Sequence, residues 1–237
     1  MRCAAWVVWA AAWAADPIQR NGLRFMTLQD KLDDITAQTR NLVQPERLAL
    51  NERAIAELFA SGIEDKLLKP GDAAPAFALP DANGKLVRSV DLLALGPLVV
   101  CFFRGRWCPY CVTELETWRD LFPALRERGA LLVAISPQMV RQNDFTVAQH
   151  TLPFPLLRDE GARVAAEFGA AYSVPDSMQG YYRSILVNIP FINGEQSWRL
   201  PVPATFLIGR EGVIRWSQGH ADFRVRPEPR DALKALE

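Results

Sequence analysis

The chain has 237 residues, of which 49% are hydrophobic, and its 27 basic and 27 acidic side chains cancel. This composition is typical of a folded protein with a substantial core. Because a neutral chain has no basic field to attract phosphates, nucleic acid is not expected as a partner. The four cysteines are too few to build the fold on disulfides.

The first segment, residues 1–25, contains an apolar run with a small-x-small pattern at residues 12–14, as a secretory signal would. The run is too short to span a bilayer, so no membrane association is expected. Met26 directly precedes a helix start in which Thr27 can cap the helix and Asp30 suits its first turn. We therefore expect an over-extended start, with translation beginning at Met26 and a cytoplasmic protein. Export through an N-terminal signal is the alternative.

A helical hairpin is expected over residues 26–62. In its first helix the apolar side chains, with one threonine in register, recur in steps of four and three at Leu28, Leu32, Ile35, Thr39 and Leu42. Such a narrow seam predicts packing against a single helix, and the second helix, residues 45–60, is the nearest candidate. Homodimer formation through the same seam is the alternative.

The main domain is expected over residues 66–237. Strands are predicted at 98–103, 130–135, 154–157, 205–208 and 213–217, and helices at 109–128, 140–150, 160–168 and after Pro229. Alternating strands and helices predict an α/β fold, an open sheet covered on both faces. Residues 170–201 are predicted to be a long irregular segment that forms a lid or a partner surface.

Two cysteines, Cys108 and Cys111, lie where the strand at 98–103 gives way to the helix at 109–128. Cys111 falls on the buried face of that helix, and Pro109 is a favourable first helical residue. We expect Cys108 to be the exposed thiol, stabilised as a thiolate by the helix N-terminus, with Cys111 behind it within disulfide reach. Arg104 and Arg106 would add positive charge nearby.

Two other interpretations of the cysteine pair are weaker. A metal site needs more ligands, but Cys3 and Cys101 have no paired spacing and His150 and His220 are isolated, so no metal is expected. Buried cysteines that only pack are common, but the strand-to-helix position favours redox chemistry. No nucleotide-binding glycine motif occurs, so we expect no bound cofactor and an external thiol as electron donor.

Three segments, residues 72–79, 98–111 and 202–208, together resemble the alkyl hydroperoxide reductase and thiol-specific antioxidant (AhpC/TSA) family. The chain is most similar to peroxiredoxin-like members with a Cys-x-x-Cys motif and an N-terminal helical extension. The resemblance implies a thioredoxin-like fold, in which helices flank a central mixed sheet. It also implies that the Cys108–Cys111 dithiol reduces hydroperoxides with electrons from thioredoxin, glutaredoxin or glutathione. A thiol-disulfide oxidoreductase and a non-catalytic redox sensor or adaptor are the alternatives.

The resemblance also assigns residues. It implies that Pro203 is a cis proline facing the dithiol, and we expect the substrate site to be shaped by Arg104, Trp107, Pro109, Tyr110, Pro203 and Thr205. Typical family members carry Pro-x-x-x-Thr-x-x-Cys and a later arginine. Neither register restores the proline and threonine, since alignment on Cys108 puts Cys101 and Gly105 at those positions and alignment on Cys111 fails likewise. In addition, Pro203 falls about where the later arginine is expected.

The order of attack is open at the level of sequence. Alignment on the family's peroxidatic cysteine selects Cys111, and then Arg104 takes the proline position and Cys108 the threonine position. The helix-end argument instead makes Cys108 the first nucleophile and Cys111 its partner. Glu114 is expected to be a solvated helix residue, because glutamates are seldom buried.

Overall fold

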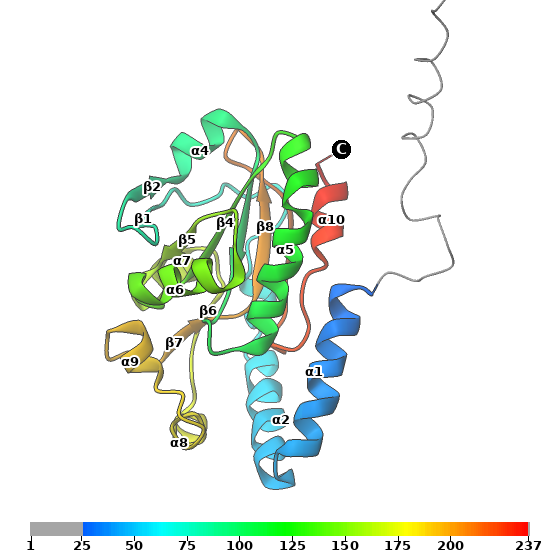
Figure 1. The fold of residues 1–237 in the computed structure, drawn as a ribbon, viewed down its shortest axis with the longest axis vertical. Coiled ribbons are helices and arrows are strands. Elements are labelled where there is room, and N and C mark those ends of the chain that lie inside the picture. Colours follow the sequence, from blue (N-terminus) through cyan, green and yellow to red (C-terminus); the bar gives the residue numbers. More distant parts are fainter. Residues whose placement is uncertain (1–25, 237) are drawn as a thin grey trace, which may run out of the picture.

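The structure, a computed structural model, describes residues 26–236, so the expectations for residues 1–25 lie outside the described part of the chain. Its centre is a sheet in the order β5-β4-β3-β8-β9 (Figure 1). The strands are β3 (Leu98–Phe102), β4 (Leu131–Ser136), β5 (Leu156–Arg158), β8 (Ala204–Ile208) and β9 (Ile214–Gly219). β3, β4 and β5 pair in parallel, whereas β8 and β9 are antiparallel to their neighbours. The predicted mixed sheet is confirmed.

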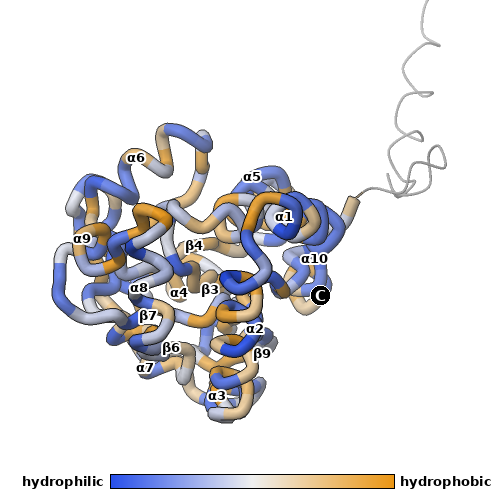
Figure 2. The backbone as a smooth tube through the Cα atoms, turned by 90° about the horizontal axis from the view of Figure 1, so that it is seen from below, coloured by the Kyte–Doolittle hydropathy of each residue, from blue (hydrophilic) through white to orange (hydrophobic). Residues whose placement is uncertain are grey.

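The alternation of side chains along β3 divides the core into two layers. Val100 and Phe102 point to one face and pack with Phe168 and Phe206, whereas Val99 points to the other. All five residues of β3 are buried, which explains why the strand reads as a continuous apolar run. Figure 2 shows β3 and β4 as hydrophobic stretches in the middle of the molecule.

Helices cover both faces of this sheet. The first layer contains α7 (Arg163–Glu167), preceded by a 3-10 turn at Glu160–Ala162; the second contains α5 (Pro109–Glu127), α6 (Val140–His150) and α10 (Pro229–Lys234). A two-stranded ribbon of β1 (Ala78–Pro80) and β2 (Leu86–Arg88) leads into α4 (Ser89–Leu95). None of the helices between residues 26 and 236 has the length and apolarity needed to cross a bilayer.

The two expected N-terminal helices are present as α1 (Leu28–Leu42) and α2 (Pro45–Ala60), followed by the short α3 (Ile63–Lys66). The expectation that they pack mainly against each other is wrong. α1 places Leu28 and Leu32 against α5, whereas α2 contacts α8 and α3 and has no fully buried residue of its own. The seam of α1 therefore serves the main core, and the boundary between hairpin and main domain stays a prediction.

The segment at residues 170–201 is not irregular, contrary to expectation. It forms β6 (Ala171–Ser173), α8 (Asp176–Ser184), α9 (Ile189–Asn193) and β7 (Arg199–Pro201), and β6 pairs with β7. Val174, Met178 and Tyr182 anchor α8 in a small core of its own. Short elements with one buried face each gave too little periodicity for detection in the sequence. Anchored in this way, α8 packs against α2 and lies near the start of α5.

Candidate active site

The loop between β3 and α5 sets the orientation of two arginines. Gly105 has a φ of +148°, a conformation that favours glycine, and a Cβ there would lie 2.5 Å from Trp107 Nε1. Arg104, before the glycine, is buried with only 2% of its surface exposed. Arg106, after it, donates to Gln142 and lies over Phe145, on α6. Of the two arginines expected near the dithiol, therefore, only Arg104 contacts it.

Cys111 is completely buried on the inner face of α5 and accepts hydrogen bonds from two nitrogen donors. The Arg104 backbone N–H donates to its Sγ at 3.3 Å, and Arg226 Nη2 donates at 3.3 Å. One donor comes from the loop just before the helix and the other from the C-terminal segment, 115 residues further along the chain. Two donors converging on one sulfur stabilise its anionic form.

The second partner of Arg226 is Glu114, so the expectation of a solvated glutamate is wrong. Glu114 is fully buried one turn after Cys111, and its Oε2 pairs with Arg226 Nη1. Burial raises the pKa of Glu114 to about 7, despite the opposing charge of Arg226. The sequence held a usable signal, since position 114 shares the buried helix face of Cys111 and Trp118.

Cys108 is less exposed than expected. It is the N-cap of α5, and Pro109 follows at the first helical position, but its side chain makes no capping hydrogen bond and only 2% of its surface is exposed. Its nearest side-chain donors are more distant than those of Cys111: Arg226 Nη2 at 3.9 Å and Arg104 Nη1 at 4.0 Å. The expected exposed thiolate at the helix end is therefore wrong, because the helix end provides no donor to this sulfur.

The two thiols consequently differ in acidity. Burial raises the pKa of both, and at Cys108 the neighbouring Cys111 raises it further. At Cys111 burial is outweighed by the hydrogen bond from Cys108 and by the charges of Arg226 and Arg104, which bring its pKa well below the ordinary value. The shorter donor distances at Cys111 support the same direction. Cys111 is therefore the more acidic thiol of the pair.

Arg104 is enclosed by aromatic rings. Its guanidinium carbon lies 4.3 Å from the ring centroid of Phe223, 4.8 Å from Trp107 and 5.7 Å from Tyr182, whose hydroxyl pairs with Nη2. Burial raises the pKa of the Tyr182 phenol, so this partner stays neutral at ordinary pH. Arg104 thus brings positive charge to the dithiol and, within residues 26–236, is not ion-paired with a carboxylate.

A cavity of about 170 Å³ opens onto Cys108 between α1, α2 and α8. Among the residues expected to shape the site, it is lined by Arg104, Trp107, Pro109 and Tyr110, together with Cys108. The Tyr110 hydroxyl lies 3.2 Å from the Thr36 hydroxyl of α1, so the N-terminal extension contributes directly to this wall.

Two predicted site residues lie elsewhere. Pro203 and Thr205 are buried, and neither lines this cavity. No peptide bond between residues 26 and 236 is cis, so the expectation of a cis Pro203 is wrong. Thr205 is paired opposite Cys101 within the sheet. Within the same described range, no cluster of three or more histidine, cysteine or acidic side chains could hold a metal ion.

The comparison with known families decides the family. The AhpC/TSA family matches residues 70–217, more than half of the chain. The chain belongs to the AhpC/TSA family. Residues that the match leaves out include α1, α2 and Arg226, so in this member of the family part of the cavity wall and the arginine on Cys111 come from outside the shared region.

AhpC/TSA relatives of known name agree with this assignment. Chloroplastic peroxiredoxin Q of Oryza sativa subsp. japonica is 27% identical over 167 residues, which cover 70% of this chain and 66% of the rice protein. Chloroplastic peroxiredoxin Q of Sedum lineare is 28% identical over 182 residues, 77% of this chain and 84% of that protein. The crystal structure of peroxidoxin BcpB from Mycobacterium tuberculosis superposes with a TM-score of 0.56 and 26% identity, covering 71% of this chain and 96% of that chain. The predicted thioredoxin-like fold is confirmed.

Proposed function

We propose that the protein is a thiol-dependent peroxidase of the two-cysteine type, in which Cys111 attacks the hydroperoxide and Cys108 resolves the product. One observation carries the proposal. Cys111 Sγ accepts hydrogen bonds from the Arg104 N–H and from Arg226, each at 3.3 Å, inside a buried site. The names of the relatives, peroxiredoxin Q and peroxidoxin, support the same reaction class.

The proposed reaction has two steps on the protein. The Cys111 thiolate attacks the outer oxygen of ROOH, the O–O bond breaks, and Cys111 becomes a sulfenic acid while RO⁻ takes up a proton and leaves as ROH. The Cys108 sulfur then attacks the Cys111 sulfur and displaces water, which forms the disulfide. Two external thiols reduce that disulfide by exchange and restore the dithiol. Thioredoxin, glutaredoxin and glutathione are the candidate donors.

Arg226 takes the role of the later arginine that Pro203 replaces in the family pattern. Its guanidinium touches both the Cys111 sulfur and the Glu114 carboxylate, so it can stabilise the thiolate and the negative charge that develops on the leaving oxygen. Glu114 holds the guanidinium in place and is a positioning residue.

One observation favours the opposite order of attack. Cys108 lines the cavity of about 170 Å³, whereas Cys111 lies behind it. Attack at Cys111 therefore requires that the first turn of α5 shifts to admit the peroxide. The acidity of the thiols favours Cys111 and the access route favours Cys108. We weight acidity more heavily, because only the thiolate is the nucleophile.

We expect mild oxidation of the native protein to join Cys108 to Cys111 within one chain. The two residues lie on the first turn of α5, where their side chains interact. Peptide mapping by mass spectrometry under non-reducing conditions checks this. Cys101, buried in β3 on the same side of the sheet, is the internal control and should remain a free thiol. A disulfide from either residue to Cys101 would contradict the mechanism.

The pH dependence of the first oxidation tests the identity of the thiolate. Cys108→Ser keeps a hydroxyl donor beside Cys111. In this variant the rate of sulfenic acid formation should rise with pH in proportion to the fraction of Cys111 that is present as thiolate. Its midpoint should lie below the ordinary cysteine pKa of 9.0, because Arg226 and Arg104 favour the anion. Stopped-flow mixing with a sulfenic-acid trap measures this rate. Cys108→Ala, which lacks the donor, should shift the midpoint upward, and equal midpoints in the two variants would count against this assignment.

A steady-state assay tests the function as a whole. Thioredoxin or glutathione serves as donor, and hydrogen peroxide, an organic hydroperoxide or a model disulfide serves as acceptor. Turnover of a hydroperoxide at a rate that saturates with donor supports the peroxidase. If hydroperoxides react only at the background rate while the disulfide is reduced catalytically, the protein is a disulfide reductase. Stoichiometric oxidation without turnover would instead indicate a redox sensor.

A further inference from the structure

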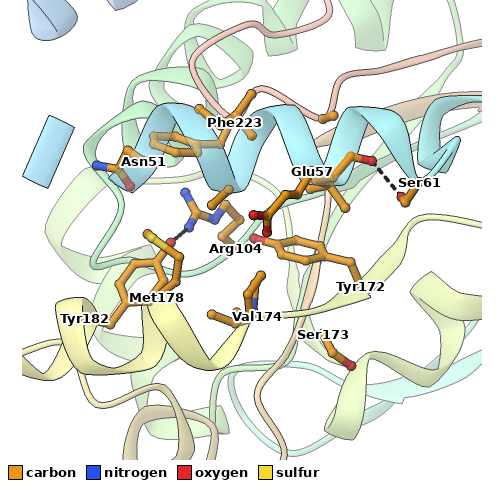
Figure 3. A pocket seen from close by; sticks show the side chains of 15 residues that line it. Asn51, Glu57, Ser61, Arg104, Tyr172, Ser173, Val174, Met178, Tyr182 and Phe223 are labelled. Carbon is orange, nitrogen blue, oxygen red and sulfur yellow. Dashed lines mark hydrogen bonds between the residues drawn. The ribbon is translucent and has the colours of Figure 1, made fainter. Parts of the chain in front are cut away.

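A second cavity, of about 290 Å³, lies on the other side of Arg104 from the thiols. Neither Cys108 nor Cys111 lines it, although it shares Asn51, Arg104, Tyr182 and Phe223 with the cavity of about 170 Å³ beside Cys108. Its walls come from α2, from β6 and α8, and from the segment after β9 (Figure 3). Since α2 and Phe223 lie outside the residues that match the AhpC/TSA family, the shared family region does not account for this cavity.

The lining of this cavity is amphipathic. Apolar side chains, among them Ala54, Leu58 and Met178, form much of its wall. Arg104 points into the same space, as Figure 3 shows, and is its buried cation. The Nε atom of Arg104 is buried and has no hydrogen-bond partner. An apolar chamber with one convergent charged group is the usual form of a small-molecule site.

Among residues 26–236 no carboxylate forms an ion pair with Arg104, and the acidic groups that act most strongly on it are the phenols of Tyr172 and Tyr182 and the two thiols. Burial raises the pKa of both phenols, so they remain neutral. The thiolate of Cys111 is shared with Arg226. An anion bound beside this buried guanidinium would be stabilised by its positive charge.

We propose that this cavity binds a small amphipathic monoanion, a carboxylate with a short apolar tail. The carboxylate would pair with Arg104, where two parallel hydrogen bonds are the favoured geometry, and the tail would contact α2 and α8. Glu57 also lines the cavity, and Figure 3 shows its side chain directed into it. Glu57 forms no ion pair with Arg104, and because it is exposed on α2 its negative charge is screened by water, unlike the positive charge of the buried guanidinium. Arg104 Nη1 also lies 4.0 Å from Cys108 Sγ, so the bound carboxylate and the dithiol would both contact the Arg104 guanidinium.

Isothermal titration calorimetry of the reduced full-length chain with octanoate tests the proposal, and octan-1-ol is the uncharged probe of equal length. We expect octanoate to bind with one-to-one stoichiometry and the alcohol to bind at least about tenfold more weakly, since it lacks the charge that pairs with Arg104. This comparison uses the unmodified protein, so it does not depend on the folding of any variant. Equal affinities of the two probes, or no saturable binding of octanoate, would overturn the proposal.

A matched pair of variants on α2 locates the site. Ala54→Phe fills the cavity, whereas Ala56→Phe makes the same change at an exposed position of the same helix. We expect Ala54→Phe to weaken octanoate binding by at least about tenfold and Ala56→Phe to leave it unchanged. Octanoate binding that survives in Ala54→Phe, with a melting transition like that of Ala56→Phe, would place the ligand elsewhere and refute the assignment.

Discussion

Replacing Cys111 by serine is expected to abolish peroxide consumption, with a fall in kcat/KM of about 10³-fold or more, because the nucleophile itself is removed. Cys108→Ser should instead retain one stoichiometric turnover and leave a sulfenic acid on Cys111 that a dimedone probe traps. The structural reason is that the Arg104 N–H and Arg226 both donate to Cys111 Sγ at 3.3 Å, closer than any side-chain donor lies to Cys108. Rapid-quench peroxide consumption with mass spectrometry of the labelled peptide measures both.

The control for this experiment is Cys101→Ser, because Cys101 is an equally buried cysteine that is not expected to react. Its peroxide consumption should match the unmodified protein. The opposite pattern, with sulfenic acid on Cys108 in the Cys111→Ser variant and no reaction in Cys108→Ser, would make Cys108 the attacking residue. It would show that access from the cavity outweighs thiol acidity at this site.

Replacing Arg226 by methionine should lower both activity and stability. Loss of the donor on Cys111 should reduce kcat/KM by about 10²-fold, as removal of one preorganised donor does in other enzymes. The fully buried Glu114 would lose its counter-ion, which costs about 3–5 kcal/mol of the free energy of unfolding for a buried pair. Peroxide kinetics and urea unfolding measure the two effects. Arg215→Met, which breaks an exposed pair with Glu211, is the control and should leave the stability nearly unchanged.

The pH dependence separates charge from packing in Arg226→Met. Without Arg226 the pKa of Glu114 in the folded state should rise further above its unfolded value of 4.5, so the folded state holds a proton that the unfolded state releases. Between those two pKa values stability then falls as pH rises, and the variant should be more stable near pH 5.5 than near pH 8. A destabilisation independent of pH would indicate lost packing instead.

A double variant completes this test. Glu114→Leu combined with Arg226→Met removes both buried charges, so most of the lost stability should return, because an apolar pair needs no counter-ion. The activity should not return, since the donor to Cys111 is still absent. Recovery of activity in the double variant would show that Arg226 acts only by neutralising Glu114.

Local sequence patterns predicted the sheet and the position of the dithiol correctly. β3 and β8 are runs of apolar residues buried on both faces, and α5 begins at Pro109 as its proline and its periodicity indicate. These predictions were correct because a strand buried on both faces, or a helix buried on one face, has a recognisable pattern of apolar residues over a short stretch of sequence. The resemblance to the AhpC/TSA family rests on the same local segments.

The chemistry of the site depends on contacts that no local pattern contains. Arg226 reaches Cys111 and Glu114 across more than 110 residues, and Tyr182 reaches Arg104 across 78. Arg226 lies in the proline-rich stretch Arg-Val-Arg-Pro-Glu-Pro, which has neither helical nor strand periodicity, so nothing in the sequence marks it as buried. The family pattern indicated that an arginine was missing, but not that the C-terminal segment supplies one.

The sequence by itself therefore determined the fold, the family resemblance and the place of two cysteines at a strand-to-helix junction, because those depend on residues that are neighbours in the chain. Only the tertiary structure showed which cysteine is the more acidic thiol. Acidity depends on the few donors within about 4 Å of each sulfur and on burial, and both are set by segments that meet only when the chain has folded. The same holds for α1, whose apolar seam was visible in the sequence while its partner, α5, was not.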